Sequence, residues 1–334
     1  MTGTAQGLFS REALDTALRT VHGVMAATPQ YRWPLLAERY GCEVWIKHEN
    51  HTPTGAFKLR GGLTYLAELA AGDLPPGLIT ATRGNHGQSI PFAAARHGVP
   101  VTVVVPEGNS DDKNRAMRGW GAELLVRGRD FDEARQHADR LARERGLAFV
   151  PSFHPALVRG VATYALELFE AVADLDAVYV PIGMGSGICA VIGVRDLLGL
   201  RTEIIGVTAA GAPAYAESFR AGAPRPQGAA RTFADGVACR EPDPAALGII
   251  LRGAARVLTV SDAEIAEAMR VLYSDTHNIA EGAGAAALAG LAQERERQRG
   301  RRVAAILCGG NIDADIFAAV LRGASGGPAS PTEA

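Results

Sequence analysis

Lysine is scarce in this chain of 334 residues. Of its 34 basic side chains only three are lysines, namely Lys47, Lys58 and Lys113. Any chemistry that needs a side-chain amine therefore has three candidates. Cysteine is also rare: the four cysteines are far apart and include no CxxC pair. That usage is typical of a reducing compartment and argues against a disulfide scaffold.

Strong charge and long apolar runs are absent as well. The formal net charge is only −2, which argues against electrostatic binding to nucleic acid or to an anionic membrane. The longest apolar candidate, residues 178–194, is broken by glycines, a proline and a serine, so it is unsuited to span a bilayer. Residues 1–15 lack the basic start and apolar run of a signal peptide. The sequence therefore predicts a cytoplasmic protein without a nucleic-acid or membrane partner.

Short apolar runs that favour strands alternate with helical patterns along most of the chain. The predicted strands are 43–49, 78–82, 101–106, 122–126, 148–151, 177–182, 203–208, 257–260 and 303–308. The predicted helices are 57–71, 87–97, 130–145, 157–173, 188–198, 262–273 and 282–297. This alternation indicates βαβ units with helices on both faces of parallel sheets. Because about nine strands fill two smaller sheets more comfortably than one, we predict an α/β fold with two open, mostly parallel twisted sheets.

The first candidate site is the segment Pro53-Thr-Gly-Ala-Phe-Lys58, which follows an extended run and opens a helix. Burial and the positive end of the helix dipole both disfavour an ammonium group, so the pKa of Lys58 should be lowered. A neutral amine is what Schiff-base chemistry requires. The alternative is a surface lysine at a helix start. Lys47 is interpreted as an outward strand residue, and Lys113 as part of a solvated helix start.

Two glycine-containing loops follow predicted strands. In Ala81-Thr-Arg-Gly-Asn-His-Gly-Gln88, the loop and helix N–H groups can hold a carboxylate, although an ordinary turn capped by Asn85 is the alternative. In Val180-Pro-Ile-Gly-Met-Gly-Ser-Gly187, the backbone can approach an anion closely, and a phosphate is the natural guest. A dinucleotide fingerprint fails because Ile188 stands where the third glycine is required.

A last strand ends in Ile306-Leu-Cys-Gly-Gly-Asn-Ile-Asp313, which would place Cys308 at the ligand-binding edge of a sheet; a buried structural cysteine is an equal alternative.

Metal and hydrolase sites are poorly supported. His48 and His51 are three residues apart rather than four, and no G-x-S-x-G motif occurs. We therefore predict no metal site.

Taken together, these four segments resemble fold-type II pyridoxal-phosphate enzymes of the threonine/serine dehydratase and serine racemase family, which have the tryptophan synthase β-like fold. The first resembles the cofactor-lysine motif, the second the substrate-carboxylate loop, the third the phosphate-binding glycine loop, and Cys308-Gly-Gly-Asn the segment under the pyridine nitrogen. Thr232-Phe-Ala-Asp-Gly-Val and Ala280-Glu-Gly-Ala-Gly-Ala-Ala also fall in the expected order. The resemblance extends from about residue 28 to residue 321.

The resemblance implies roles for individual residues. Lys58 would carry pyridoxal 5'-phosphate as a Schiff base and act as the catalytic base, with Phe57 stacked near the ring. The other implied cofactor-binding residues are Asn85, Gly183, Met184, Gly185, Ser186, Gly187, Gly236 and Cys308. The implied substrate-binding residues are Thr82, Arg83, Asn85, His86 and Glu281.

The resemblance also implies an activity and a domain organisation. The expected reaction is β-elimination of water from a β-hydroxy amino acid such as threonine or serine, giving a 2-oxo acid and ammonia. We expect a large cofactor-binding domain from residues 1–52 and 152–323, a small substrate domain from 53–151, a flexible tail from 324–334, and a homodimer. Too little chain follows residue 321 for a regulatory domain, so a catabolic type of enzyme is expected.

Arg83 departs from the racemase pattern, in which a serine occupies this position. Because a guanidinium is a poor proton shuttle, racemisation is disfavoured. Arg83 could instead bind an additional anionic group of the substrate, or simply be solvated. A related dehydratase of hydroxyectoine catabolism is therefore an alternative. The acidic cluster that would hold a structural cation is also not evident after the strand at 203–208.

Overall fold

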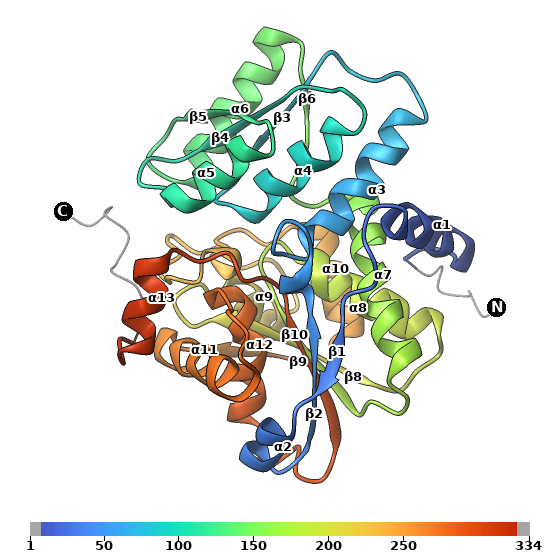
Figure 1. The fold of residues 1–334 in the computed structure, drawn as a ribbon, viewed down its shortest axis with the longest axis vertical. Helices are drawn as coiled ribbons and strands as arrows, with labels where there is room; N and C mark the ends of the chain where they lie inside the picture. The colour runs from blue at the N-terminus through green and yellow to red at the C-terminus, as the bar shows by residue number, and fades with distance from the viewer. Residues whose placement is uncertain (1–7, 326–334) are drawn as a thin grey trace.

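The computed structural model describes residues 8–325 and contains two separate sheets. The larger has the strand order β1-β2-β10-β7-β8-β9 and the smaller the order β5-β4-β3-β6. In Figure 1 the smaller sheet and its helices form the upper part of the molecule and the larger sheet lies below. The prediction of an α/β fold with two mostly parallel sheets is confirmed. The expected tail at 324–334 lies, apart from its first two residues, outside the described residues.

The large sheet combines the beginning of the chain with its second half. Its strands are β1 (Gln30–Arg32), β2 (Glu43–His48), β7 (Ala177–Pro181), β8 (Glu203–Ala209), β9 (Arg256–Val260) and β10 (Arg302–Leu307). Only β1 is antiparallel to its neighbour. Strand β1 was not predicted, because its three residues are polar or aromatic and half-exposed or exposed.

Helices and short 3-10 turns surround this sheet. They are α1 (Arg11–His22), α2 (Pro34–Tyr40), η1 (Glu49–His51), α7 (Pro155–Ala171), α8 (Ser186–Leu197), α9 (Ala214–Ala221), η2 (Asp235–Val237), α10 (Pro244–Gly253), α11 (Asp262–Thr276), α12 (Gly282–Gln293) and α13 (Ala314–Leu321). None of the helices in residues 8–325 combines the length and the apolar content that crossing a bilayer requires.

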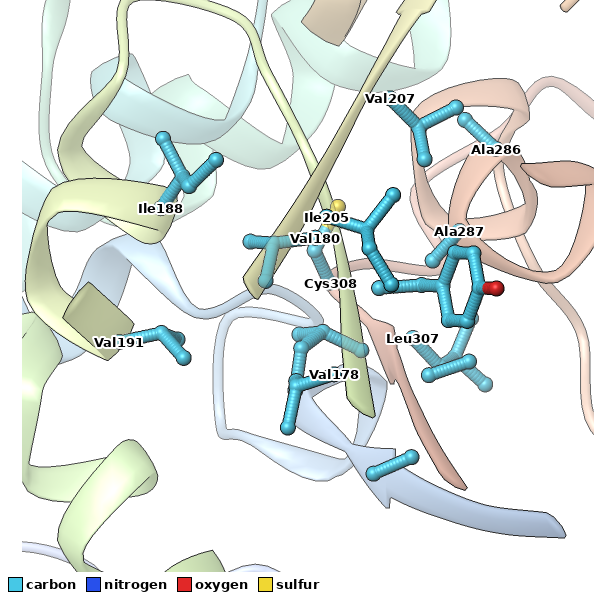
Figure 2. Close-up of a cluster of buried hydrophobic side chains, with 14 of the residues drawn as sticks. Val178, Val180, Ile188, Val191, Ile205, Val207, Ala286, Ala287, Leu307 and Cys308 are labelled. Atoms are coloured by element: carbon cyan, nitrogen blue, oxygen red, sulfur yellow. The ribbon is translucent and has the colours of Figure 1, made fainter. Parts of the chain in front are cut away.

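The core of the large sheet lies on both of its faces. Figure 2 shows Val180 of β7 and Ile205 of β8 between α8, which carries Ile188, and α12, which carries Ala287. All five residues of β7 are buried. A strand covered on both faces has no reason to alternate apolar and polar residues, which explains the continuous apolar runs in the sequence. The alanine-rich composition of α12 lets this helix pack closely over the strands.

The small sheet is formed by one continuous stretch of chain. Its strands, all parallel, are β3 (Leu78–Ala81), β4 (Val101–Val105), β5 (Glu123–Val126) and β6 (Ala148–Phe149). Its helices are α3 (Lys58–Ala70), α4 (Asn85–Ala95), α5 (Asp111–Gly119) and α6 (Phe131–Arg145). Every residue of β4 is buried, as the uninterrupted Val-Thr-Val-Val-Val run predicts.

Helix α3 joins the two sheets through close backbone contacts. A Cβ atom at Gly61 would lie 2.9 Å from the carbonyl oxygen of Leu157, and one at Gly160 of α7 would lie 2.2 Å from that of Arg60. On the side of α4, a Cβ at Gly62 would lie 2.3 Å from Ser89 Oγ. Only glycine fits at these positions, so α3 is held between α4 and α7. The first turn of α3 is therefore fixed relative to both sheets.

Candidate active site

The site lies where loops after the carboxyl ends of β3, β7 and β10 face the start of α3, the edge at which open α/β sheets bind ligands. The backbone N–H of Phe57 donates to the carbonyl of Cys308 at 3.0 Å, and Ala56 forms a β-bridge with Gly309. The end of β10 thus positions Lys58, the first residue of α3. Its Nζ atom donates a hydrogen bond of 3.3 Å to Ser186 Oγ. The amine and the glycine loop therefore meet, as the sequence predicts.

Burial makes Lys58 a usable nucleophile. Desolvation lowers the pKa of its amine to about 8, and only the neighbouring Cys308 thiol opposes the shift. The direction agrees with the sequence prediction, and burial is its main cause. Because the pKa lies close to neutrality, a substantial fraction of the amine is uncharged at physiological pH. A surface lysine at a helix start, the alternative interpretation, is wrong for this residue.

The glycine loop forms a cradle for an anion. A Cβ atom at Gly183 would lie 2.1 Å from the carbonyl oxygen of Gly236, so this position admits no side chain. Gly185 has a φ of +94°, in the left-handed region that favours glycine. Helix α8 begins directly after it, at Ser186, without a side-chain cap, so the N–H groups of its first turn lack intrahelical partners. These features fit a phosphate group.

The side chains of Tyr215 and Cys239 contact Met184 of this loop. The hydroxyl of Tyr215 donates a hydrogen bond of 3.1 Å to the carbonyl oxygen of Met184, and Met184 Sδ lies 3.8 Å from the sulfur of Cys239. On the side of α3, Lys58 Nζ lies 5.2 Å from the centre of the Phe57 ring. A Cβ at Gly187 would lie 3.8 Å from the same ring. Phe57 therefore borders both the amine and the loop.

The loop after β3 brings Asn85 into contact with residues of the large-sheet half of the chain, Glu281 and Asn311. Helix α4 begins at Asn85, and its start has no side-chain cap, so the interpretation of Asn85 as an ordinary cap is wrong. Its Nδ2 atom donates to Glu281 Oε1 at 2.6 Å, and its Oδ1 atom accepts from Asn311 Nδ2 at 2.8 Å. Burial raises the pKa of Glu281, whereas Lys113 and Asn85 partly offset this effect. Asn85 thus has a fixed orientation inside the site.

His86 provides a buried polar atom that has no partner among the described residues. The residue is only 5% exposed, and its Nε2 atom makes no hydrogen bond within residues 8–325. Burial lowers the pKa of the ring to about 3, and Lys58 contributes to this shift, so the imidazole is neutral. In the same loop, Thr82 Oγ1 accepts from the N–H of Gly84 at 3.0 Å. A buried nitrogen without a partner at the start of a helix fits a site that binds a ligand.

Cys308 follows β10 directly and is buried. Burial raises the pKa of its thiol well above the ordinary range, so the group is neutral. A neutral thiol fits next to an uncharged ring nitrogen, whereas a carboxylate there would hold such a nitrogen protonated.

A charged group that the sequence did not predict borders the site. Lys113 Nζ and Arg83 Nη1 each contact the carboxylate of Asp235 at 3.1 Å, and Lys113 Nζ lies 4.0 Å from Glu281 Oε2. The side chain of Lys113 is 11% exposed, so the interpretation as a solvated helix start is wrong. Burial alone would lower the pKa of Lys113, but Asp235 and Glu281 outweigh it and raise the pKa. The partners of Lys113 are far away in sequence. The scarcity of lysine is the only sequence signal that could have marked Lys113 as a site residue.

Lys47 is also placed differently from the prediction. Its alternation with Trp45 suggested an outward strand residue, but its side chain is completely buried and donates to Glu167 Oε2 at 2.6 Å. Arg60 of α3, equally buried, forms ion pairs with Glu49 at 2.7 Å and with Glu167 at 2.6 Å. This buried cluster (Lys47, Glu49, Arg60 and Glu167) lies behind the first turn of α3. Its sequence signal is weak, because its members come from separate elements.

The donor set as a whole fits pyridoxal 5'-phosphate: a neutral amine for its aldehyde, a glycine cradle for its phosphate and an uncharged thiol for its ring nitrogen. The family comparison agrees, because the sequence model described as "Pyridoxal-phosphate dependent enzyme" matches residues 22–309. The chain belongs to this family, and pyridoxal 5'-phosphate is its cofactor.

More specific likenesses concern threonine dehydratases and a 3-hydroxyaspartate ammonia-lyase. The chain is 34% identical over 308 residues to the L-threonine dehydratase biosynthetic IlvA of Salmonella typhimurium, covering 90% of this chain and 60% of that relative. It is 32% identical to the L-threo-3-hydroxyaspartate ammonia-lyase of Saccharomyces cerevisiae, covering 95% of this chain and 97% of that relative. The solved structure of threonine deaminase isoform 2 from Solanum lycopersicum has a TM-score of 0.89 at 29% identity, covering 96% of this chain and 89% of that chain.

Proposed function

We propose that the chain is an ammonia-lyase that removes water from a β-hydroxy amino acid, such as threonine or serine, and releases a 2-oxo acid and ammonia. The observation that carries this proposal is the position of the Lys58 amine, which lies 3.3 Å from Ser186 Oγ of the glycine loop. The loop from Thr82 to His86 reaches the same region through the contacts of Asn85 with Glu281 and Asn311, and it is suited to the substrate carboxylate. The names of the relatives support the same reaction.

The following residues would hold the cofactor. Lys58 would bind it covalently, and Gly183, Met184, Gly185, Ser186 and Gly187 would bind its phosphate. Phe57 and Gly236 would flank the ring, Asn85 would donate to the ring oxygen, and Cys308 would face the ring nitrogen. When bound, the cofactor supplies an electron sink for negative charge at the substrate Cα.

The chain's own residues then divide the remaining tasks. Lys58 takes the Cα proton as a general base, for which a pKa of about 8 is well matched. Ser186 accepts a hydrogen bond from the Lys58 amine and so holds it close to the phosphate loop. Thr82, Asn85 and the neutral His86 receive the substrate carboxylate at the start of α4, and Glu281 keeps Asn85 oriented.

The lowered pKa of Lys58 makes a testable prediction for the protein without its cofactor. Only the neutral amine attacks the aldehyde, so the rate of cofactor capture should rise with pH and level off above about pH 8. A lysine with an ordinary pKa near 10.5 would instead show a rate that still rises at pH 9.5. Stopped-flow absorbance of the apo-protein mixed with cofactor measures this profile. A midpoint near 10 would contradict the assignment of Lys58 as a desolvated amine.

Amino-acid racemisation is the less favoured alternative. The Arg83 guanidinium is paired with Asp235 at 3.1 Å, and a guanidinium is a poor proton shuttle. A dehydratase of hydroxyectoine catabolism would use the same chemistry on another side chain. The relatives' names include threonine and 3-hydroxyaspartate as substrates of those proteins.

A product assay tests the proposed function. The purified holoenzyme is offered L-serine, L-threonine, L-threo-3-hydroxyaspartate and amino acids derived from hydroxyectoine, and both 2-oxo acid and ammonia are measured. We expect the two products in equal amounts from at least one substrate. Inversion of the amino acid without ammonia release would favour the racemase alternative, and the absence of both reactions would refute the proposal.

The domain boundaries and the assembly belong to this proposal as well. Residues 1–52 with 152–323 would form the cofactor-binding domain, and residues 53–151 the substrate domain. In the apolar clusters of the two sheets, the buried residues follow this division except Val21, Met25 and Leu157, which pack with the small sheet. A homodimer is expected from the family resemblance, and a cytoplasmic location from the lack of a signal-peptide pattern in residues 1–15.

A further inference from the structure

Arg83 lies where the two proposed binding loops come together. It belongs to the loop after β3, between Thr82 and Gly84. Its partner Asp235 directly precedes Gly236, whose carbonyl oxygen lies against Gly183 of the glycine loop. The pair of Arg83 and Asp235 therefore borders both the loop proposed to bind the substrate carboxylate and the loop proposed to bind the cofactor phosphate.

At this place the chain's own Asp235 carboxylate is held by two cationic side chains. The two oxygens of Asp235 are held separately, Oδ1 by Arg83 Nη1 and Oδ2 by Lys113 Nζ, each at 3.1 Å. Within the described residues Asp235 is the only hydrogen-bond partner of the Arg83 guanidinium. The Arg83 side chain is 27% exposed. A guanidinium has five N–H donors, so Arg83 retains donors for a second carboxylate.

The charges around Arg83 favour an additional anion. Arg83 and Lys113 are both cationic, and Lys113 is held so by its carboxylate neighbours. Glu281 Oε2 lies 4.0 Å from Lys113 Nζ, and burial raises the pKa of this carboxyl. Two basic side chains, Arg83 and Lys113, thus contact the single carboxylate of Asp235. An acidic side chain on the substrate would give these two cations a second carboxylate to bind.

We propose that Arg83 is a specificity-determining residue that receives the side-chain carboxylate of an acidic β-hydroxy amino acid, of which 3-hydroxyaspartate is the simplest. Asp235 and Lys113 act as positioning residues that hold the guanidinium at the crevice. This inference rests on the proposed function, because it assigns the substrate class of the same site. The Cα–H and Cβ–O bonds break and water leaves; hydrolysis of the product then returns water and yields a 2-oxo dicarboxylic acid and ammonia.

Substitution of Arg83 tests the proposal through a ratio of two rates. For each variant, kcat/KM is measured for 3-hydroxyaspartate and for serine. We expect Arg83→Ser to lower the ratio of the two values by roughly tenfold to a hundredfold, because a charge-assisted hydrogen bond to the acidic substrate is lost. Arg83→Lys keeps the charge but loses the planar arrangement of donors, so its kcat/KM ratio should lie between those of the wild type and Arg83→Ser. The matched control Arg115→Ser removes an arginine that is 82% exposed and should leave the ratio unchanged.

A binding measurement without turnover complements the rates. Succinate carries two carboxylates but no amine, and butyrate carries only one carboxylate. Succinate should raise the unfolding temperature of the wild-type holoenzyme more than butyrate does, and this difference should disappear in Arg83→Ser.

The outcomes separate this inference from the proposed function. If Arg83→Ser slows both substrates equally, Arg83 serves only to bridge the two sheets and the inference is wrong. If the wild type converts serine but not 3-hydroxyaspartate, the inference fails and the ammonia-lyase proposal stands. If no β-hydroxy amino acid releases ammonia, the proposed function itself fails.

Discussion

Replacement of Lys58 by alanine should give a folded protein that neither turns yellow with pyridoxal 5'-phosphate nor releases ammonia from any β-hydroxy amino acid. The amine is the covalent attachment point in our proposal and also the base that takes the Cα proton. Loss of a positioned general base alone costs about 10²–10⁴-fold in rate, and loss of cofactor attachment adds to this. The visible absorption band and the product assay measure the two effects.

A second variant makes this prediction sharper. Lys58→Arg keeps a positive charge at the start of α3, but a guanidinium stays protonated and cannot form the Schiff base. It should therefore be as colourless and inactive as Lys58→Ala, while circular dichroism shows both to be folded. A yellow, active Lys58→Ala protein would show that the cofactor is attached elsewhere.

Replacement of Arg60 by leucine should destabilise the protein more than any surface substitution. The guanidinium forms two hydrogen bonds with Glu49 and two with Glu167, all between 2.6 and 3.0 Å, and all of these side chains are nearly or completely buried. Leucine would leave two carboxylates in the core, with Lys47 as the remaining buried amine beside them and the His22 ring 2.9 Å from Glu167. Breaking a buried ion pair from one side costs about 3–5 kcal/mol in the free energy of unfolding. Urea denaturation measures the loss.

The exposed Arg115 again offers a matched control, because Arg115→Leu should change the unfolding free energy by less than about 0.5 kcal/mol. Arg60→Lys keeps the charge, so its loss of unfolding free energy should lie between those of Arg60→Leu and Arg115→Leu. If Arg60→Leu lost less than about 1 kcal/mol, the cluster would not be the stabilising element that its geometry indicates.

The sequence predicted much of the fold because its signals are local. Residues 101–105 form the expected buried strand, and α3 begins at Lys58 as the Pro-Thr-Gly corner suggests. The four motifs also have local signatures, since each combines a strand end with glycine and a polar residue. The family comparison confirms the resemblance that those motifs carry.

What the sequence could not predict depends on contacts between distant segments. Lys47 meets Glu167, which is 120 positions further along the chain, and Lys113 meets Asp235, which is 122 positions further. Nothing near Lys47 or Lys113 in the sequence indicates that these carboxylates will be their neighbours. Patterns of alternation and adjacent acidic residues therefore led to the wrong interpretation of both lysines.

The glycine contacts of α3 and the ion pairs around Asp235 imply that the two sides of the crevice respond differently to the solvent. At Gly61 and Gly160 the backbones touch directly, so this seam resists sliding and is insensitive to dissolved ions. Another contact between the two sheets is the partly exposed ion pair of Arg83 and Asp235, and salt screens such pairs. Ionic strength should therefore weaken the Arg83–Asp235 contact and leave the α3–α7 contact unchanged. The two sheets would then separate at the ion pair and stay joined at the glycine contacts.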